Sequence, residues 1–154
     1  MLSDKVREIV ALNHQAVLTT FRKSGAAQMS IVTVGVHGKG VAFTISPGSA
    51  KLANLRRNPR CSLMVAQSDW LDYAVLEGRA QVLSPDGAPP EELRLTLRGV
   101  YRAASGKEHP DWEEYDQAVR DDRRSAIIVV DLPPIVVPLL MLVQPRPWVL
   151  CSRW

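Results

Sequence analysis

The sequence predicts a mainly β fold, a closed or split barrel of six strands with helices at its periphery. Six short apolar or alternating segments succeed one another along the 154 residues: 16–21, 29–36, 41–45, 61–67, 74–83 and 125–130. Most are joined by hairpin-like turns and the predicted helices are few, which favours a barrel over a parallel sheet. Neither GxGxxG nor GxxxxGK[ST] occurs, so no Rossmann or P-loop nucleotide site is predicted.

The first half alternates strands and turns. Ser3 is placed to cap an opening helix whose apolar residues recur at helical spacing. A glycine turn at residues 22–26 separates the first two strands, and the His-Gly-Lys-Gly run at residues 37–40 predicts a hairpin into the third. Glu77-Gly78, inside the fifth strand, is interpreted as a bulge.

The helices of the second half follow a loop at residues 84–90. Residues 91–104 place apolar side chains on one face, and His109-Pro110 opens a further helix. That helix is expected to turn Trp112, Tyr115 and Val119 inward, before the last strand at residues 125–130. We therefore expect a domain over residues 1–130.

The remaining residues, 131–154, are apolar and contain five prolines. The apolar stretch 127–143 is interrupted by Asp131 and three prolines, and is shorter than the roughly 20 residues that span a bilayer. We expect a tail that packs on the barrel or on a partner chain, and no membrane segment.

Composition and charge narrow the function classes. Charged residues make up 23% and hydrophobic residues 46%, as in ordinary globular domains, and the net charge is +3. That mild basicity suits an anionic ligand, but aromatic residues do not interleave with bases as nucleic-acid stacking platforms require. The two cysteines and three histidines fit no metal spacing, and the absence of a signal peptide and of a disulfide framework makes the cytoplasm the expected location.

Residues 46–59, SPGSAKLANLRRNP, are the most informative segment. A short helix is predicted to open at Ser49 and to end at Asn58-Pro59, because proline disfavours helical geometry in the residue before it. A helix start offers unpaired N–H groups and a positive dipole end, and Lys51 and Asn54, three residues apart, share one face. The segment therefore predicts a cradle for a phosphorylated cofactor. On spacing alone it also fits a simple amphipathic connector, with Leu52 and Leu55 inward and the arginines solvated.

Other constellations carry less chemistry. No nucleophile triad is evident, and the acidic pairs lie where first turns of helices favour them. Trp70 and Tyr73 flank a turn and are suited either to wall a flat ring or to pack in the core or at the surface.

The chain resembles a known family in four runs: GAAQMSIVTV, SPGSAKLANLRRNPRCSLMV, DWLDYAVLEGRAQV and DWEEYDQAVRDDRR. Together they are similar to the pyridoxamine-5′-phosphate-oxidase-like split-barrel flavoproteins, and most similar to the actinobacterial branch that uses the deazaflavin coenzyme F420. The resemblance covers residues 12–130. The KxxNLRRxPR signature combined with the Tyr-Ala-Val-x-Glu-Gly strand is its most specific part.

The resemblance implies a homodimer of six-stranded split barrels with two cofactors at the interface. Lys51 and Asn54 would bind the cofactor tail, Ser49 would contribute less, and the further bases Arg56, Arg57 and Arg60 would suit a long anionic tail. The remaining expected site residues are Gln28 and Ser30 on the strand facing the ring, Thr44 and Ile45 at the end of the next strand, and Trp70 and Tyr73 from the other protomer.

The implied function is oxidoreduction of an unidentified small organic substrate, with the hydride carried by F420. FMN is the alternative cofactor, since its phosphate would fit the same Lys51 region. A cofactor-binding protein without turnover is a further alternative, because no side-chain acid or base stands out. The sequence departs from the family at Ala27, where proline is usual, and at Ile31, where asparagine is common.

Overall fold

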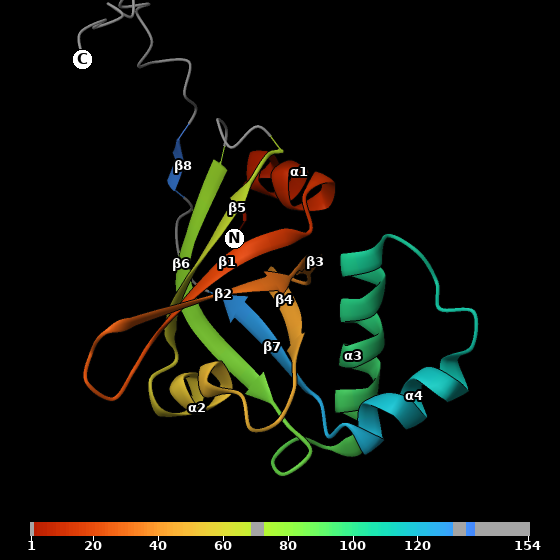
Figure 1. Cartoon of the computed structure of the whole chain (residues 1–154). Coiled ribbons are helices and arrows are strands. Elements are labelled where there is room, and N and C mark those ends of the chain that lie inside the picture. Colours follow the sequence, from red (N-terminus) through yellow and green to blue (C-terminus); the bar gives the residue numbers. More distant parts are fainter. Residues whose placement is uncertain (1, 69–72, 131–134, 138–154) are drawn as a thin grey trace, which may run out of the picture.

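A computed structural model describes residues 2–68, 73–130 and 135–137 of the chain (Figure 1). It confirms the mainly β prediction: a curled antiparallel sheet is flanked by helices at its ends and on one side. In chain order the elements are α1 (Asp4–Leu12), β1 (Gln15–Phe21), β2 (Ala27–Thr33), β3 (Gly35–His37), β4 (Gly40–Ile45), α2 (Ala50–Arg57), β5 (Arg60–Ala66), β6 (Tyr73–Leu83), α3 (Pro90–Ser105), α4 (Trp112–Asp121), β7 (Ser125–Val130) and β8 (Ile135–Val137).

The sheet has the strand order β2-β1-β5-β6-β7-β4-β3, with β8 paired to β6 beside that path. Strands β2 and β3 are consecutive in the chain but stand at opposite ends of this order. The sheet must therefore curl until its two ends meet, which makes the split in the barrel the gap between β2 and the β3–β4 pair. The interior is filled by alternate residues of the strands, such as Leu18, Phe43, Leu63 and Ile127, each fully buried.

The predicted single strand at residues 29–36 was wrong, because the chain changes partners within it. Residues up to Thr33 pair with β1, and residues from Gly35 pair with β4. Val34 lies fully buried at the break, and its N–H donates to the carbonyl of His14 at 2.7 Å. A side chain at Gly35 would lie 2.3 Å from the backbone carbon of Ala103, so glycine permits α3 to approach the crossing.

The predicted bulge at Glu77-Gly78 was also wrong. The β5–β6 register runs through both residues without interruption, with Ser62 opposite Glu77 and Cys61 opposite Gly78. A Cβ at Gly78 would lie 2.6 Å from a methyl carbon of Val129, so this glycine permits β7 to cross closely.

The predicted helices are present, with one shifted start. Helix α4 begins at Trp112, and Asp111 caps it by accepting hydrogen bonds from the N–H groups of Glu113 and Glu114. Three residues of the predicted tail form β8, which pairs with β6 at residues 73–75. Together with the division of residues 29–36 into β2 and β3, this gives the described sheet two strands more than predicted. Residues 131–134 and 138–154 lie outside the described part, and the boundary at residue 130 stays an expectation.

Candidate functional site

Helix α2 follows β4 directly and lies at one end of the sheet (Figure 1). Leu52 and Leu55 are buried and fix the helix to the core, as predicted. Gly48, with a φ of 73°, provides the left-handed turn that lets the chain reverse from β4 into α2. Because these leucines fix the orientation of α2, its cationic residues lie on the faces of the helix that do not contact the core.

The start of α2 keeps its N–H groups available. The Ser49 hydroxyl donates to the carbonyl of Ser46 at 3.0 Å, and its side chain accepts no bond from the first turn. The first backbone bond of the helix runs from the N–H of Ala53 to the carbonyl of Ser49. The N–H groups of residues 50–52 therefore have no acceptor among the described residues, and this is the arrangement that attracts an anion.

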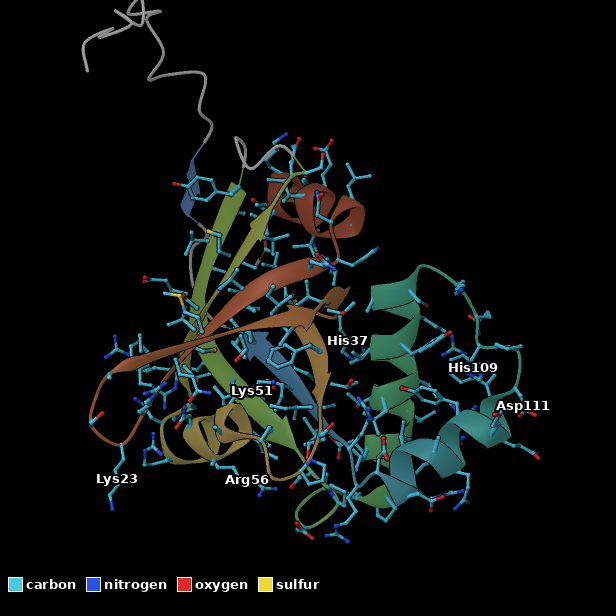
Figure 2. The ribbon with its side chains drawn as sticks, viewed as in Figure 1. Lys23, His37, Lys51, Arg56, His109 and Asp111 are labelled. Atoms are coloured by element: carbon cyan, nitrogen blue, oxygen red, sulfur yellow. The ribbon has the colours of Figure 1, made fainter. Side chains whose placement is uncertain are left out.

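Lys51 stands in this first turn, half-buried, and makes no ion pair with a described residue. Figure 2 shows Lys51 and Arg56 on opposite sides of α2, as expected for residues roughly 140° apart around a helix. Arg56 lies 4.0 Å from a carboxylate oxygen of Asp86, and both side chains are about half exposed or more. Lys51 and Arg56 therefore do not share one face.

Asn54, the second predicted tail ligand, is buried with only 6% of its surface exposed. Its amide nitrogen donates to the hydroxyl of Thr20 and to the side-chain oxygen of Gln28, both at 3.1 Å. Its amide oxygen accepts from Arg57 at 3.0 Å, and Arg57 also donates to the carbonyl of Phe21. Asn54 and Arg57 are thus engaged within the chain, where they tie α2 to β1 and β2.

The strands on the two sides of the split supply the other predicted residues. Gln28 and Ser30 are half-buried on the inward side of β2, and Thr44 is half-buried on β4. Ile45 is 1% exposed, so its side chain belongs to the core and offers a ligand no surface. Thr44 and Thr33 line one cavity of about 410 Å³, which α3 and α4 close on the other side.

The two departures from the pattern of the similar family, Ala27 and Ile31, lie on the outer face of β2. Ala27 and Ile31 are exposed and alternate with Gln28 and Ser30, so they point to the opposite face of β2. Neither substitution therefore changes the inward face of the strand.

The outer face of the sheet carries an apolar row. The register aligns Ile31, Val17, Met64 and Val75 across β2, β1, β5 and β6. Ile31 and the neighbouring Met29 are 72% and 69% exposed. Tyr73, half-buried, lies on this same face opposite Ala66, whereas Trp70 falls outside the described residues.

An ion cluster joins α3 to α4 and was missed by the sequence analysis. Asp116, 6% exposed, accepts from Arg98 at 2.6 and 2.9 Å and from Arg94 at 3.3 Å. The hydrogen bond from Arg98, and less so that from Arg94, holds the pKa of Asp116 below its usual range despite burial. The four-residue spacing of Arg94 and Arg98 on one helix face was the available signal.

Thr20 and Thr33 were also missed. Thr20 is fully buried at a position where the β1 alternation requires an inward residue, and a polar residue at such a position was the available signal. Within the described ranges no three or more of the His, Cys, Asp and Glu side chains gather as a metal site, and no described helix has the length and apolarity to cross a bilayer.

Comparison with known proteins places this geometry in context. A family model described as pyridoxamine 5′-phosphate oxidase matches residues 2–131. A conserved hypothetical protein of Mycobacterium tuberculosis superposes with a TM-score of 0.73 at 18% identity, over 90% of this chain and 86% of that one. A protein named F420 reductase gives 0.60 at 18%, over 87% and 98% of the two chains. A heme binding protein of Mycobacterium smegmatis gives 0.65 at 22%, over 90% of this chain and 55% of that one. At these identities the structures establish a shared fold.

Proposed function

The chain belongs to the pyridoxamine 5′-phosphate oxidase family, and from this premise we propose that it is an oxidoreductase using coenzyme F420 to move a hydride to or from a small organic substrate. The observation that carries the proposal is the start of α2, where three N–H groups without an acceptor among the described residues lie in the same turn as Lys51. The similarity in fold to a protein named F420 reductase supports the choice of cofactor.

The donors at this site fit the phosphate of such a cofactor. Three backbone N–H groups and one ammonium, which has no carboxylate partner in the described chain, together match an anion with several acceptor oxygens. Because the Ser49 hydroxyl is bonded to Ser46, it leaves those N–H groups to the ligand. Lys51 and residues 50–52 would therefore hold the phosphate.

The Asn54 network would position the site. Asn54 holds the side-chain oxygen of Gln28, which leaves the two amide hydrogens of Gln28 free to turn toward the split. Bound F420 or FMN supplies the hydride chemistry, and the protein's part is to orient the ring and exclude water. Thr44 on β4 and Ser30 on β2, the strands that border the split, have side chains without a hydrogen-bond partner among the described residues.

We propose that two copies of the chain complete the site. Exposure of the outer apolar row to water is unfavourable, and a second copy of the chain would bury it. The row consists of Ile31, Val17, Met64 and Val75. Tyr73 lies on that face and would be carried toward the partner.

Fluorescence titration of F420 and of FMN, at low and at high salt, tests the cofactor. The tail of F420 has more negative charges than FMN, so F420 should bind more tightly and its advantage should shrink as salt screens exposed pairs beyond about 8 Å. Arg56→Ala should narrow the difference without abolishing FMN binding. Tighter binding of FMN at low salt would show that the chain uses a flavin. If neither cofactor bound, a protein without catalytic turnover would become the favoured alternative.

Lys51→Ala tests the cradle itself. Loss of one charge-assisted contact should weaken either cofactor by about 1–3 kcal/mol with no change in thermal stability. Lys39→Ala, in the exposed β3–β4 turn, is the matched control and should bind as the wild type does. Equal affinity of a folded Lys51→Ala variant would remove Lys51 from the site.

A further inference from the structure

A second cavity lies between α3, α4 and the loop that leads into α3, apart from the start of α2. Its volume is about 530 Å³, within the range of small-molecule sites. Leu93, Leu97, Val119 and Ala88 give it an apolar floor, continuous with a separate buried cluster of the protein. Val119 also lines the cavity of about 410 Å³ beside Thr33 and Thr44, but none of these four residues belongs to α2 or to the Lys51 cradle.

Arginines dominate the polar part of the lining. Four guanidinium groups, those of Arg94, Arg120, Arg123 and Arg124, face two carboxylates, so the lining has an excess of two positive charges. Both carboxylates are already bonded to Arg94. Of the remaining three arginines, Arg123 and Arg124 are paired with Asp86 and Asp122 outside the lining, so Arg120 is the cation that an incoming group meets without a carboxylate partner in the described chain.

These three arginines are only partly engaged. Arg124 donates through Nε to Asp122 at 3.2 Å, and Arg123 donates through one nitrogen to Asp86. Arg120 donates to the neutral amide oxygen of Gln117 and to no carboxylate of a described residue. A guanidinium has five N–H donors, so each retains free ones for an anion.

The backbone at the same place is strained. Arg123 has a φ of 48°, and it is the one non-glycine residue of the described chain with a positive value. A side chain in that region costs roughly 1–2 kcal/mol. The conformation turns the chain sharply after α4 and sets three arginines at the edge of one cavity.

The walls of the cavity are fixed before any ligand arrives. Asp116 bridges the two helices through Arg94 and Arg98. Tyr101 of α3 packs edge-to-face against Trp112 and Tyr115 of α4, and the Tyr115 hydroxyl donates to the carbonyl of Leu97. A preformed site loses less free energy to ordering when it binds.

We propose that this cavity binds a small amphipathic carboxylate, with the carboxylate at Arg120, Arg123 and Arg124 and the apolar body on the leucine floor. An uncharged apolar molecule would leave the arginines unused, and a compact inorganic anion would leave the floor exposed to water. The proposal does not depend on whether the chain uses F420, FMN or neither.

Calorimetric titration of the full chain with decanoate tests the proposal, with decanol and acetate as probes that lack the charge or the apolar body. Decanoate should bind once per chain, and the other two at least tenfold more weakly. Arg120→Gln should weaken decanoate about tenfold, because an exposed charged donor is lost and the fold is not at risk. Arg79→Gln, an exposed arginine on the outer face of β6, is the matched control and should bind as the wild type does.

A second variant checks the location. Ala88→Phe fills the floor and should abolish decanoate binding, while melting of each variant confirms that it is folded. Equal affinity for decanol and decanoate, an unchanged Arg120→Gln, or no binding at all would overturn the proposal. The proposal would also be overturned if Ile31→Glu lost decanoate binding while Ala88→Phe kept it, because decanoate would then bind on the outer face of the sheet.

Discussion

Replacing Asn54 with alanine should destabilise the protein by about 2.5–4.5 kcal/mol. The substitution removes two hydrogen bonds to neutral groups, each contributing roughly 0.5–1.5 kcal/mol, and one from a charged group, contributing roughly 1.5–3 kcal/mol. Arg57 is exposed and regains water, so its term lies at the low end, whereas Thr20 is fully buried and loses a partner that water does not replace. Urea unfolding, followed by circular dichroism, measures the free energy directly.

The matched control is Asn58→Ala, four residues further along. The Asn58 side chain accepts one bond, from the N–H of Arg60 at 3.2 Å, at an exposed position, so its loss should cost less than about 1 kcal/mol. In a chain of this length the Asn54 variant should melt roughly 5–15 °C below the wild type. A loss below 1 kcal/mol with an unchanged denaturant slope would refute the assignment of Asn54 as the link between α2 and β1–β2.

Three more outcomes are expected. The arginine partners of Asp116 lower its folded-state pKa, so the stability that this ion cluster contributes is present above the unfolded pKa of about 4 and is lost as pH falls through the folded pKa. Urea midpoints measured from pH 7 to 2.5 should therefore fall more steeply for the wild type than for Asp116→Asn, and parallel curves would exclude a stabilising role of the Asp116 charge. Burial raises the pKa of Cys61 to about 11, so in a Cys151→Ser background the thiol should resist a disulfide reagent at pH 7 until urea is added, and prompt native labelling would contradict its burial. Light scattering should give a mass of about twice 17.1 kDa for the wild type and a monomer mass for Ile31→Glu. Leu12→Glu, at an exposed apolar position on α1, is the control and should remain a dimer, whereas a dimer in all three proteins would place the interface elsewhere.

The sequence was sufficient for features that local chemistry decides. Alternation of apolar residues predicted the strands, and Ser49 with Asn58-Pro59 bracketed α2 within a residue of its observed bounds. The inward turn of Leu52 and Leu55 also followed from helical spacing. Each of these depends on residues within a few positions of one another.

Features that depend on residues far apart in the chain could not be predicted from the sequence. The break at Val34 follows from β2 and β3 pairing with different strands, and nothing in the apolar run 29–36 shows it. Glu77-Gly78 was interpreted as a bulge, yet Gly78 is required by the close approach of β7, about fifty residues later. The partners of Asn54 likewise lie 26 and 34 residues away.

These long-range contacts change how the signature residues are understood. In KxxNLRRxPR, Asn54 and Arg57 bind the protein's own strands, whereas Lys51 makes no ion pair with a described residue and is the residue that we propose to bind the anion. On this proposal the signature combines one ligand-binding residue with the two residues that hold its helix against β1 and β2. On this division, Asn54→Ala lowers cofactor affinity only together with fold stability, whereas Lys51→Ala lowers affinity alone. Measuring both quantities for both variants separates a residue that touches the ligand from residues that position it.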